Sequence, residues 1–236
     1  MAIHYHLNGE PLLDPRLPQI IAQGRALNPR STHYFSTNGS LLGKRANEFF
    51  SQPESLPDSI TVSFDGGTKE AYETHRVGLV FEKTLESVKK FIETRDALGF
   101  DKPKVTPLMI ITRDNERTVE EFKRLWKGVL VEGLDSIYFG PLMNWAGEVE
   151  VSRPTRQEFR RSTPCPYLHR WVFIIHTGEA VMCCMDYEGR EIVGDARTQT
   201  VHEIYMSARY QELRELYSQE RWDELPLCKN CSLRSG

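Results

Sequence analysis

The cysteines are the residues whose spacing points most directly to chemistry. All five cysteines of the 236-residue chain lie between Cys165 and Cys231. Cys228-x-x-Cys231 is a pair in which a tight turn brings two thiolates to one metal ion or to two corners of one cluster. Cys165 and Cys183 complete a set of four thiolates. The spacing therefore predicts a metal site with these four ligands, holding either an iron–sulfur cluster or zinc.

The remaining cysteine, Cys184, directly follows Cys183. The segments WVFIIH and EAVMCC flank Thr177-Gly178, a pattern typical of a β-hairpin in which Gly178 takes the positive φ of a two-residue turn. Neighbouring residues on a strand point to opposite faces, so only one of the two cysteines can easily join the site. We therefore predict that Cys183 is the ligand and that Cys184 is the odd thiol.

The cysteines could instead form disulfides or be unrelated buried thiols. Disulfides require an oxidising compartment, and the opening residues Met1-Ala2-Ile3-His4 do not resemble a signal peptide. A C-x-x-C with two further spaced cysteines seldom arises by chance. Zinc remains an alternative, although cysteine-only zinc sites more often pair two C-x-x-C knuckles.

Composition is that of an ordinary globular protein, with 39% hydrophobic and 27% charged residues. The net charge of −3 gives no electrostatic footprint for nucleic acid. No apolar run approaches the length of a membrane span. We therefore expect a cytoplasmic protein with neither a nucleic-acid nor a membrane partner.

Upstream of the cysteines, segments typical of strands alternate with segments typical of helices. Strands are predicted at 2–7, 32–36, 59–64, 104–112 and 136–142, and helices at 17–27, 40–50, 68–74, 79–98 and 119–130. This alternation indicates parallel pairing with right-handed crossovers, hence an α/β sheet or a partial barrel. Residues 1–150 are predicted to form this domain. Residues 151–236 are predicted to form a second, cysteine-containing domain with helices at 201–206 and 209–217.

Polar residues follow each predicted strand. They are Gly9-Glu10-Pro11, Thr37-Asn38-Gly39, Asp65-Gly66-Gly67, Arg113-Asp114-Asn115 and Asn144-Trp145. Each motif alone is ordinary turn or capping chemistry. The carboxyl ends of parallel strands meet at one edge of a sheet, so together these loops predict a site for a small ligand.

Several motifs in combination resemble a known family. The spacing Cys165-x12-Gly178-x4-Cys183, the CC-x-D of 183–186 and the closing PLCKNC resemble the SPASM/twitch auxiliary-cluster domain of radical SAM enzymes. HLNGEPLLDPRL is similar to the GGEP motif of that superfamily, with Asn8 in place of the first glycine. FSTNGSLL and VSFDGGTKEAYETHR resemble its next two strand–loop units. The resemblance implies an α/β fold, a partial (β/α) radical-SAM-type barrel followed by a small domain with a β-hairpin and helices.

Two departures from the family pattern change what the resemblance implies. No cysteine precedes Cys165, so the C-x3-C-x2-C loop that holds the catalytic cluster is absent from this sequence. The sequence opens where the second strand is expected, so we expect the first strand and helix of the barrel to be missing. A full SPASM domain has further cysteines, so the shorter twitch form, with one auxiliary 4Fe–4S cluster, is expected here.

By resemblance, a second group of residues would bind S-adenosylmethionine. They are Gly9, Glu10, Pro11, Asn38, Ser63 and Asp65. The segment 9–11 would meet the methionine amino group, and Ser63 with Asp65 would lie near the ribose or the substrate. In the family, the methionine part of S-adenosylmethionine also chelates the unique iron of the catalytic cluster. Without that iron, the pocket loses the main contact that holds S-adenosylmethionine.

The resemblance implies an oxidoreductase-like iron–sulfur protein, an incomplete radical SAM enzyme acting on a peptide or a small molecule. Another chain carrying the missing segment is an expected partner, and this chain alone is not expected to cleave S-adenosylmethionine. The alternatives are a non-catalytic iron–sulfur module for binding or electron transfer, and a zinc-stabilised α/β binding protein.

Overall fold

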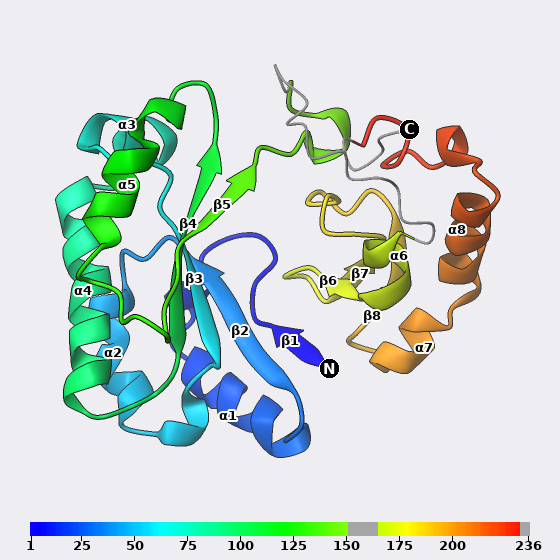
Figure 1. The fold of residues 1–236 in the computed structure, drawn as a ribbon. Coiled ribbons are helices and arrows are strands. Elements are labelled where there is room, and N and C mark those ends of the chain that lie inside the picture. Colours follow the sequence, from blue (N-terminus) through cyan, green and yellow to red (C-terminus); the bar gives the residue numbers. More distant parts are fainter. Residues whose placement is uncertain (151–164, 232–236) are drawn as a thin grey trace. The chain divides into compact units, whose positions relative to one another are not determined.

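The computed structural model describes residues 1–150 and 165–231. The chain forms two compact units, Met1–Pro141 and Leu142–Gly236. The first unit ends at Pro141, before the domain boundary predicted at residue 150. Figure 1 shows the elements of each unit.

The first unit is built on a parallel sheet of five strands in the order β1-β2-β3-β4-β5. The strands are β1 (Ala2–His4), β2 (Thr32–Thr37), β3 (Ser59–Ser63), β4 (Lys104–Ile111) and β5 (Tyr138–Pro141). Pairing is in register from strand to strand, as in Tyr34 opposite Ser59 and Ser59 opposite Lys104. The order of the strands in the sheet is the same as their order in the chain, so each new strand is added at the same edge of the sheet. The result is the curled half-barrel of an α/β fold, as predicted.

Helices connect successive strands of this sheet (Figure 1). They are α1 (Leu17–Leu27), α2 (Leu42–Phe50), α3 (Lys69–His75), α4 (Phe81–Ala97) and α5 (Val119–Trp126), with short 3-10 turns η1 (Pro11–Leu13), η2 (Pro53–Ser55) and η3 (Glu116–Thr118). Phe35, Val62 and Met109 on the strands are buried in one core with helix residues such as Phe91. The next residue along each of β2 and β3, such as Ser36 and Ser63, is only half-buried. The sheet therefore has one apolar, helix-covered face and one more polar face.

Two local predictions for this unit are wrong in detail. β1 ends at His4, before the predicted limit at residue 7. The helix predicted from residue 40 begins at Leu42, because the backbone N–H and the hydroxyl of Ser40 donate to Asn38 Oδ1, at 2.9 and 2.7 Å. The Asn38 side chain therefore closes its own turn, a common use of asparagine after a strand.

The second unit contains an antiparallel sheet, β6 (Phe173–Ile174), β7 (Glu179–Val181) and β8 (Ile192–Asp195). The predicted hairpin is confirmed, and Gly178 has φ 91°. Its turn is longer than two residues, because the N–H of Gly178 bonds to Ile175 O at 2.9 Å and the N–H of Ile175 bonds to Glu179 O at 2.9 Å. The third strand, β8, was not predicted from the sequence.

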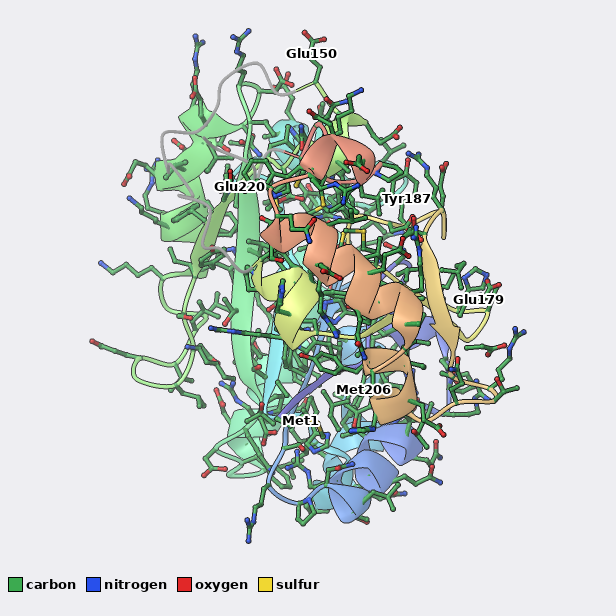
Figure 2. The ribbon with its side chains drawn as sticks, turned by 90° about the vertical axis from the view of Figure 1, so that its right-hand side faces the viewer. Met1, Glu150, Glu179, Tyr187, Met206 and Glu220 are labelled. Atoms are coloured by element: carbon green, nitrogen blue, oxygen red, sulfur yellow. The ribbon has the colours of Figure 1, made fainter. Side chains whose placement is uncertain are left out.

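Helices enclose the core of the second unit. They are α6 (Pro166–Arg170), α7 (Val201–Tyr205) and α8 (Ala208–Ser218), with 3-10 turns η4 (Trp145–Gly147) and η5 (Trp222–Glu224). Met206 lies between α7 and α8, and Glu220 lies just beyond α8 (Figure 2). Leu168, Met182 and Leu213 are buried together in the core. None of the helices in the described part of the chain is long and apolar enough to cross a membrane.

Candidate metal centre and ligand edge

Each cysteine of the second unit lies beside a regular element. Cys165 directly precedes α6, Cys183 and Cys184 follow β7, and the C-x-x-C pair follows η5. The N–H of Cys231 donates to Cys228 O at 3.3 Å, which is the tight turn expected of this motif. All five cysteines are half-buried, and none forms a disulfide.

The thiols lie within electrostatic reach of one another. Burial raises the pKa of the Cys183 thiol far above its usual value, and negative charge on Cys184, Cys228 and Cys231 raises it further. Burial also raises the pKa of Cys184 to about 12, with added contributions from Cys231 and Cys165. Cys165, Cys183 and Cys228 also pack against the same hydrophobic core. Segments distant in sequence therefore deliver their cysteines to one place.

Cys183 and Cys184 do not lie on a strand, so the prediction that they point to opposite faces of a sheet is wrong. β7 ends at Val181, so both cysteines lie beyond the strand, in a turn closed by the N–H of Asp186 bonding to Cys183 O at 3.1 Å. Alternation between sheet faces does not apply there. Cys184 is electrostatically coupled to Cys165 and Cys231, so it lies among the other thiols. The choice of Cys183 as the ligand stays a prediction.

The thiols are not arranged around a single ion. Within residues 1–150 and 165–231, no three or more His, Cys, Asp or Glu side chains are grouped so that they could hold one metal ion. A zinc ion with bonds of about 2.3 Å would hold its sulfur ligands about 3.8 Å apart. A cubane attaches each thiolate to a different iron corner and holds the sulfurs farther apart. A cluster does not require its four thiolates to converge on one ion, because each binds a separate iron.

Asp186 fixes the loop that carries Cys183 and Cys184. Its carboxylate, in a residue only 1% exposed, accepts hydrogen bonds from the backbone N–H groups of Arg190 at 2.8 Å and Glu191 at 2.9 Å. The sequence marked Asp186 only as part of the CC-x-D motif. A buried carboxylate that accepts two N–H groups orders the intervening turn, so Asp186 positions the two cysteines.

The loop at Asn144 and Trp145 belongs to the second unit and not to the sheet edge where it was predicted. Asn144 Nδ2 donates to Asn230 O at 2.6 Å. Asn230 lies between Cys228 and Cys231, so this bond holds the backbone of the C-x-x-C turn. A partner far away in sequence, which local patterns do not report, decides this role.

In the first unit, the Glu10 carboxylate links the loop after β1 to the end of β2. Oε1 accepts from Leu12 N at 3.0 Å and from the Thr37 hydroxyl at 2.7 Å, and Oε2 accepts from Asn38 N at 2.7 Å. A carboxylate has about four acceptor positions, so Oε2 can accept one more donor. Glu10 can therefore brace the loop and still bind a cationic group.

The neighbours of Glu10 leave space at this edge. Gly9 has φ 90°, and apart from its two chain neighbours no atom of the described residues lies within 4 Å of the place where its Cβ would stand. Pro11 opens η1, and Glu10 caps that turn. Gly9, Glu10, Pro11 and Asn38 are thus brought together at the carboxyl ends of β1 and β2, as predicted for a ligand edge.

Both oxygens of the Asp65 carboxylate contact other residues of the protein. One carboxylate oxygen accepts from Ile110 N at 2.6 Å, and the other forms an ion pair with Arg76. Asn115 Nδ2 donates to Asp65 O at 3.1 Å, which ties the loop after β3 to the loop after β4. Ser63 is the last residue of β3 and is half-buried. The two residues lie at the predicted edge, but the Asp65 carboxylate is buried behind it.

The chain is similar to a known domain family and to known folds. Residues 165–232, which include all five cysteines, match the family model of SPASM, an iron–sulfur cluster-binding domain. The structure of BtrN in complex with AdoMet and 2-DOIA aligns with a TM-score of 0.57 and 16% identity, over 98% of this chain and 72% of that one. The fold is of the radical SAM type.

Further solved structures share this radical SAM-type fold. Native anSMEcpe with bound AdoMet aligns with a TM-score of 0.62 and 14% identity, over 98% of this chain and 74% of that one. Native anSMEcpe with bound AdoMet and the Cp18Cys peptide gives 0.61 and 15%, over 98% and 75%. No curated protein matches the chain. At these identities the likeness is one of fold, while the SPASM match bears on residues 165–232.

Proposed function

We propose that this chain is an iron–sulfur protein of the radical SAM/SPASM type, in which Cys165, Cys183, Cys228 and Cys231 bind one auxiliary 4Fe–4S cluster. The observation that carries the proposal is that Cys165, Cys183 and Cys228 pack against one core, with Cys231 in the same turn as Cys228. They come from distant segments, and all lie in the range that matches an iron–sulfur cluster-binding domain. When bound, the cluster supplies one-electron chemistry.

The protein's own groups prepare the site in two ways. Burial keeps the Cys183 and Cys184 thiols protonated at neutral pH without metal, so binding at either one releases a proton. Asp186 and Asn144 hold the two loops that carry the cysteines. Folding therefore places the thiols, and metal binding deprotonates them.

The carboxyl edge of β1 and β2 is proposed to bind S-adenosylmethionine. The remaining acceptor position of Glu10 Oε2 suits an ammonium group, and Gly9 leaves room for it. Asp65 is proposed to act on the pocket indirectly, by holding the loops after β3 and β4. BtrN and anSMEcpe, which share the fold, have structures with bound AdoMet.

The substrate is proposed to be a peptide or a small molecule, and the reaction an oxidation. The sheet face away from the helices offers half-buried hydrogen-bonding groups, including His4, Tyr34 and Thr61. Such groups suit an uncharged substrate with several hydrogen-bonding positions. BtrN has been solved with 2-DOIA and anSMEcpe with a peptide, so both substrate classes occur on this fold.

Anaerobic reconstitution with iron and sulfide tests the proposed cluster. We expect about four iron and four sulfide per chain, as one cubane requires. Stoichiometric zinc in protein purified without oxygen, combined with no iron uptake, would contradict the proposal.

A non-catalytic role is the second candidate, because no residue before Cys165 is a cysteine. Cleavage of S-adenosylmethionine needs a cluster with an open iron, and the proposed auxiliary cluster has four thiolate ligands. In the radical SAM function proposed above, such a cluster comes from residues outside this chain; in the non-catalytic alternative, no such cluster is needed. Reconstituted protein with dithionite and S-adenosylmethionine should release no 5′-deoxyadenosine, and addition of a polypeptide with a C-x3-C-x2-C loop should restore release. Turnover by this chain alone, above a cysteine-free control, would contradict this expectation.

A further inference from the structure

Arg214 on α8 is held between two aromatic rings. Its Cζ lies 3.8 Å from the centroid of the Tyr205 ring and 4.1 Å from that of Tyr210. Nε donates to Leu168 O at 3.0 Å, and Nη1 donates to Tyr205 O at 2.7 Å. Nη2 is buried and has no hydrogen-bond partner in the described part of the chain. The guanidinium is thus fixed in the protein, and its Nη2 group is left unused.

Among the described residues no carboxylate pairs with Arg214, since Nε and Nη1 donate to carbonyl oxygens and the rings beside it are uncharged phenols. Arg209 on the same helix is exposed and pairs with Glu191 at 2.8 Å and with Glu212 at 2.7 Å. A cation removed from water without an anion is unfavourable. An anion that the polypeptide does not provide would therefore be stabilised near Arg214.

Arg214 is connected to the cysteine site through α6. Leu168, whose carbonyl accepts from Arg214, is part of α6. Cys165 immediately precedes that helix, and its carbonyl accepts from His169 N at 3.1 Å. Arg214 therefore holds the helix that positions the first predicted ligand.

Tyr210 connects Arg214 to the cysteine site from a second side. Its hydroxyl donates to Trp171 O at 2.9 Å and also lies 3.3 Å from Met182 O, the carbonyl directly before Cys183. Burial raises the pKa of Tyr210 to about 12; Arg214 opposes the rise, and the Cys183 thiolate adds to it. The Tyr210 ring is thus in contact with the cation, and its hydroxyl lies beside the backbone that leads into the predicted ligand Cys183.

We propose that Arg214 compensates the negative charge of the iron–sulfur cluster and raises its reduction potential. The inference rests on the cluster proposed above. A cubane with four thiolates is an anion, and reduction adds one electron to its iron–sulfide core. A fixed cation stabilises the more negative, reduced state to a greater extent, and net charge is one of the factors that set these potentials. Arg214 is thus a positioning and charge-balancing residue.

The test compares reconstituted full-length variants by iron and sulfide content and by the midpoint potential, followed by EPR during anaerobic titration with dithionite. Arg214→Gln should keep the cluster and lower the midpoint potential. The midpoint potential should fall by at least about 59 mV, which corresponds to a tenfold weaker equilibrium for one-electron reduction. Arg214→Lys should recover most of the loss. Arg209→Gln, on the same helix, should leave the potential unchanged, because that arginine is exposed and already paired.

A fully loaded Arg214→Gln protein with the wild-type potential would overturn the inference. If this variant loses its fold or its cluster, Gln211→Glu decides. Gln211 is exposed and three positions before Arg214 on α8, so a carboxylate there comes within reach of the guanidinium and should lower the potential. The variant gives up only an exposed hydrogen bond, from Gln211 Nε2 to Met206 O at 2.7 Å. An unchanged potential in that variant overturns the role of Arg214 alone. Wild-type protein that takes up no cluster overturns the proposed function and this inference together.

Discussion

The Glu10 carboxylate accepts a hydrogen bond of 2.7 Å from the backbone N–H of Asn38. Its other oxygen accepts from the Thr37 hydroxyl and from Leu12 N. The residue that resembles the glutamate of a ligand-binding motif is therefore also a brace between two strand ends. Ligand binding and local stability are coupled through this one side chain.

Glu10→Gln should destabilise the first unit even without ligand. The amide group can accept on only one side, so either Asn38 N–H or the donors on Oε1 would face an NH2 group. Leaving a partly buried donor unsatisfied costs about 1–3 kcal/mol in the free energy of unfolding. Urea denaturation would measure this loss. Glu86→Gln, exposed on α4, is the control and should change stability by less than about 0.5 kcal/mol. Equal stabilities of the two variants would show that the brace contributes nothing.

Cysteine variants should separate the ligands from the odd thiol. Cys228→Ala removes one proposed ligand, so iron and sulfide should fall well below stoichiometry after reconstitution. Cys184→Ala should keep most of the cluster. The measurement is iron and sulfide content with the visible absorption of the cluster. Because Cys183 and Cys184 share a turn, the reverse outcome, with Cys184 essential and Cys183 dispensable, would reassign the ligand.

Asp186→Ala should weaken the second unit and its metal site together. Two backbone N–H groups lose a charged acceptor in a buried loop, which should cost about 3 kcal/mol in the free energy of unfolding. Thermal unfolding of the metal-free and reconstituted proteins would measure this. Glu188→Gln, on the same loop and paired with Arg190 at the surface, is the matched control. A destabilised variant that still binds a full cluster would limit Asp186 to a structural role.

Acid should destabilise the first unit through its histidines. The pKa of His4 is lowered to about 4 by burial and by the neighbouring His6, and burial also lowers the pKa of His6. Below about pH 6.5 the unfolded chain therefore binds protons that the folded chain does not, so stability falls from there toward about pH 4. His4→Phe keeps a ring against Tyr34, whose centroid lies 3.5 Å away, and should flatten this decline. Urea midpoints at about pH 7.5 and about pH 5 test it. An unchanged slope would contradict the assignment to His4.

Local sequence patterns determined the elements of this fold. Helical spacing of Leu85, Val88 and Ile92 predicted α4, and the alternation of strands with helices predicted the parallel sheet. Gly178 predicted the hairpin, since a positive φ is easily adopted only by glycine. These signals depend on residues a few positions apart, so the chain carries them before it folds.

Only the tertiary structure decided which side chains meet. Asp65 bonds to Ile110, and Asn144 bonds to Asn230, across separations that no local pattern spans. The length of β7 decided that Cys184 stands in a turn among the other thiols. Arg214 looks like any other helix arginine in the sequence, and its lack of a counterion among the described residues is visible only once its neighbours are placed. The physical reason is that burial, charge balance and long-range hydrogen bonding are properties of the packed chain.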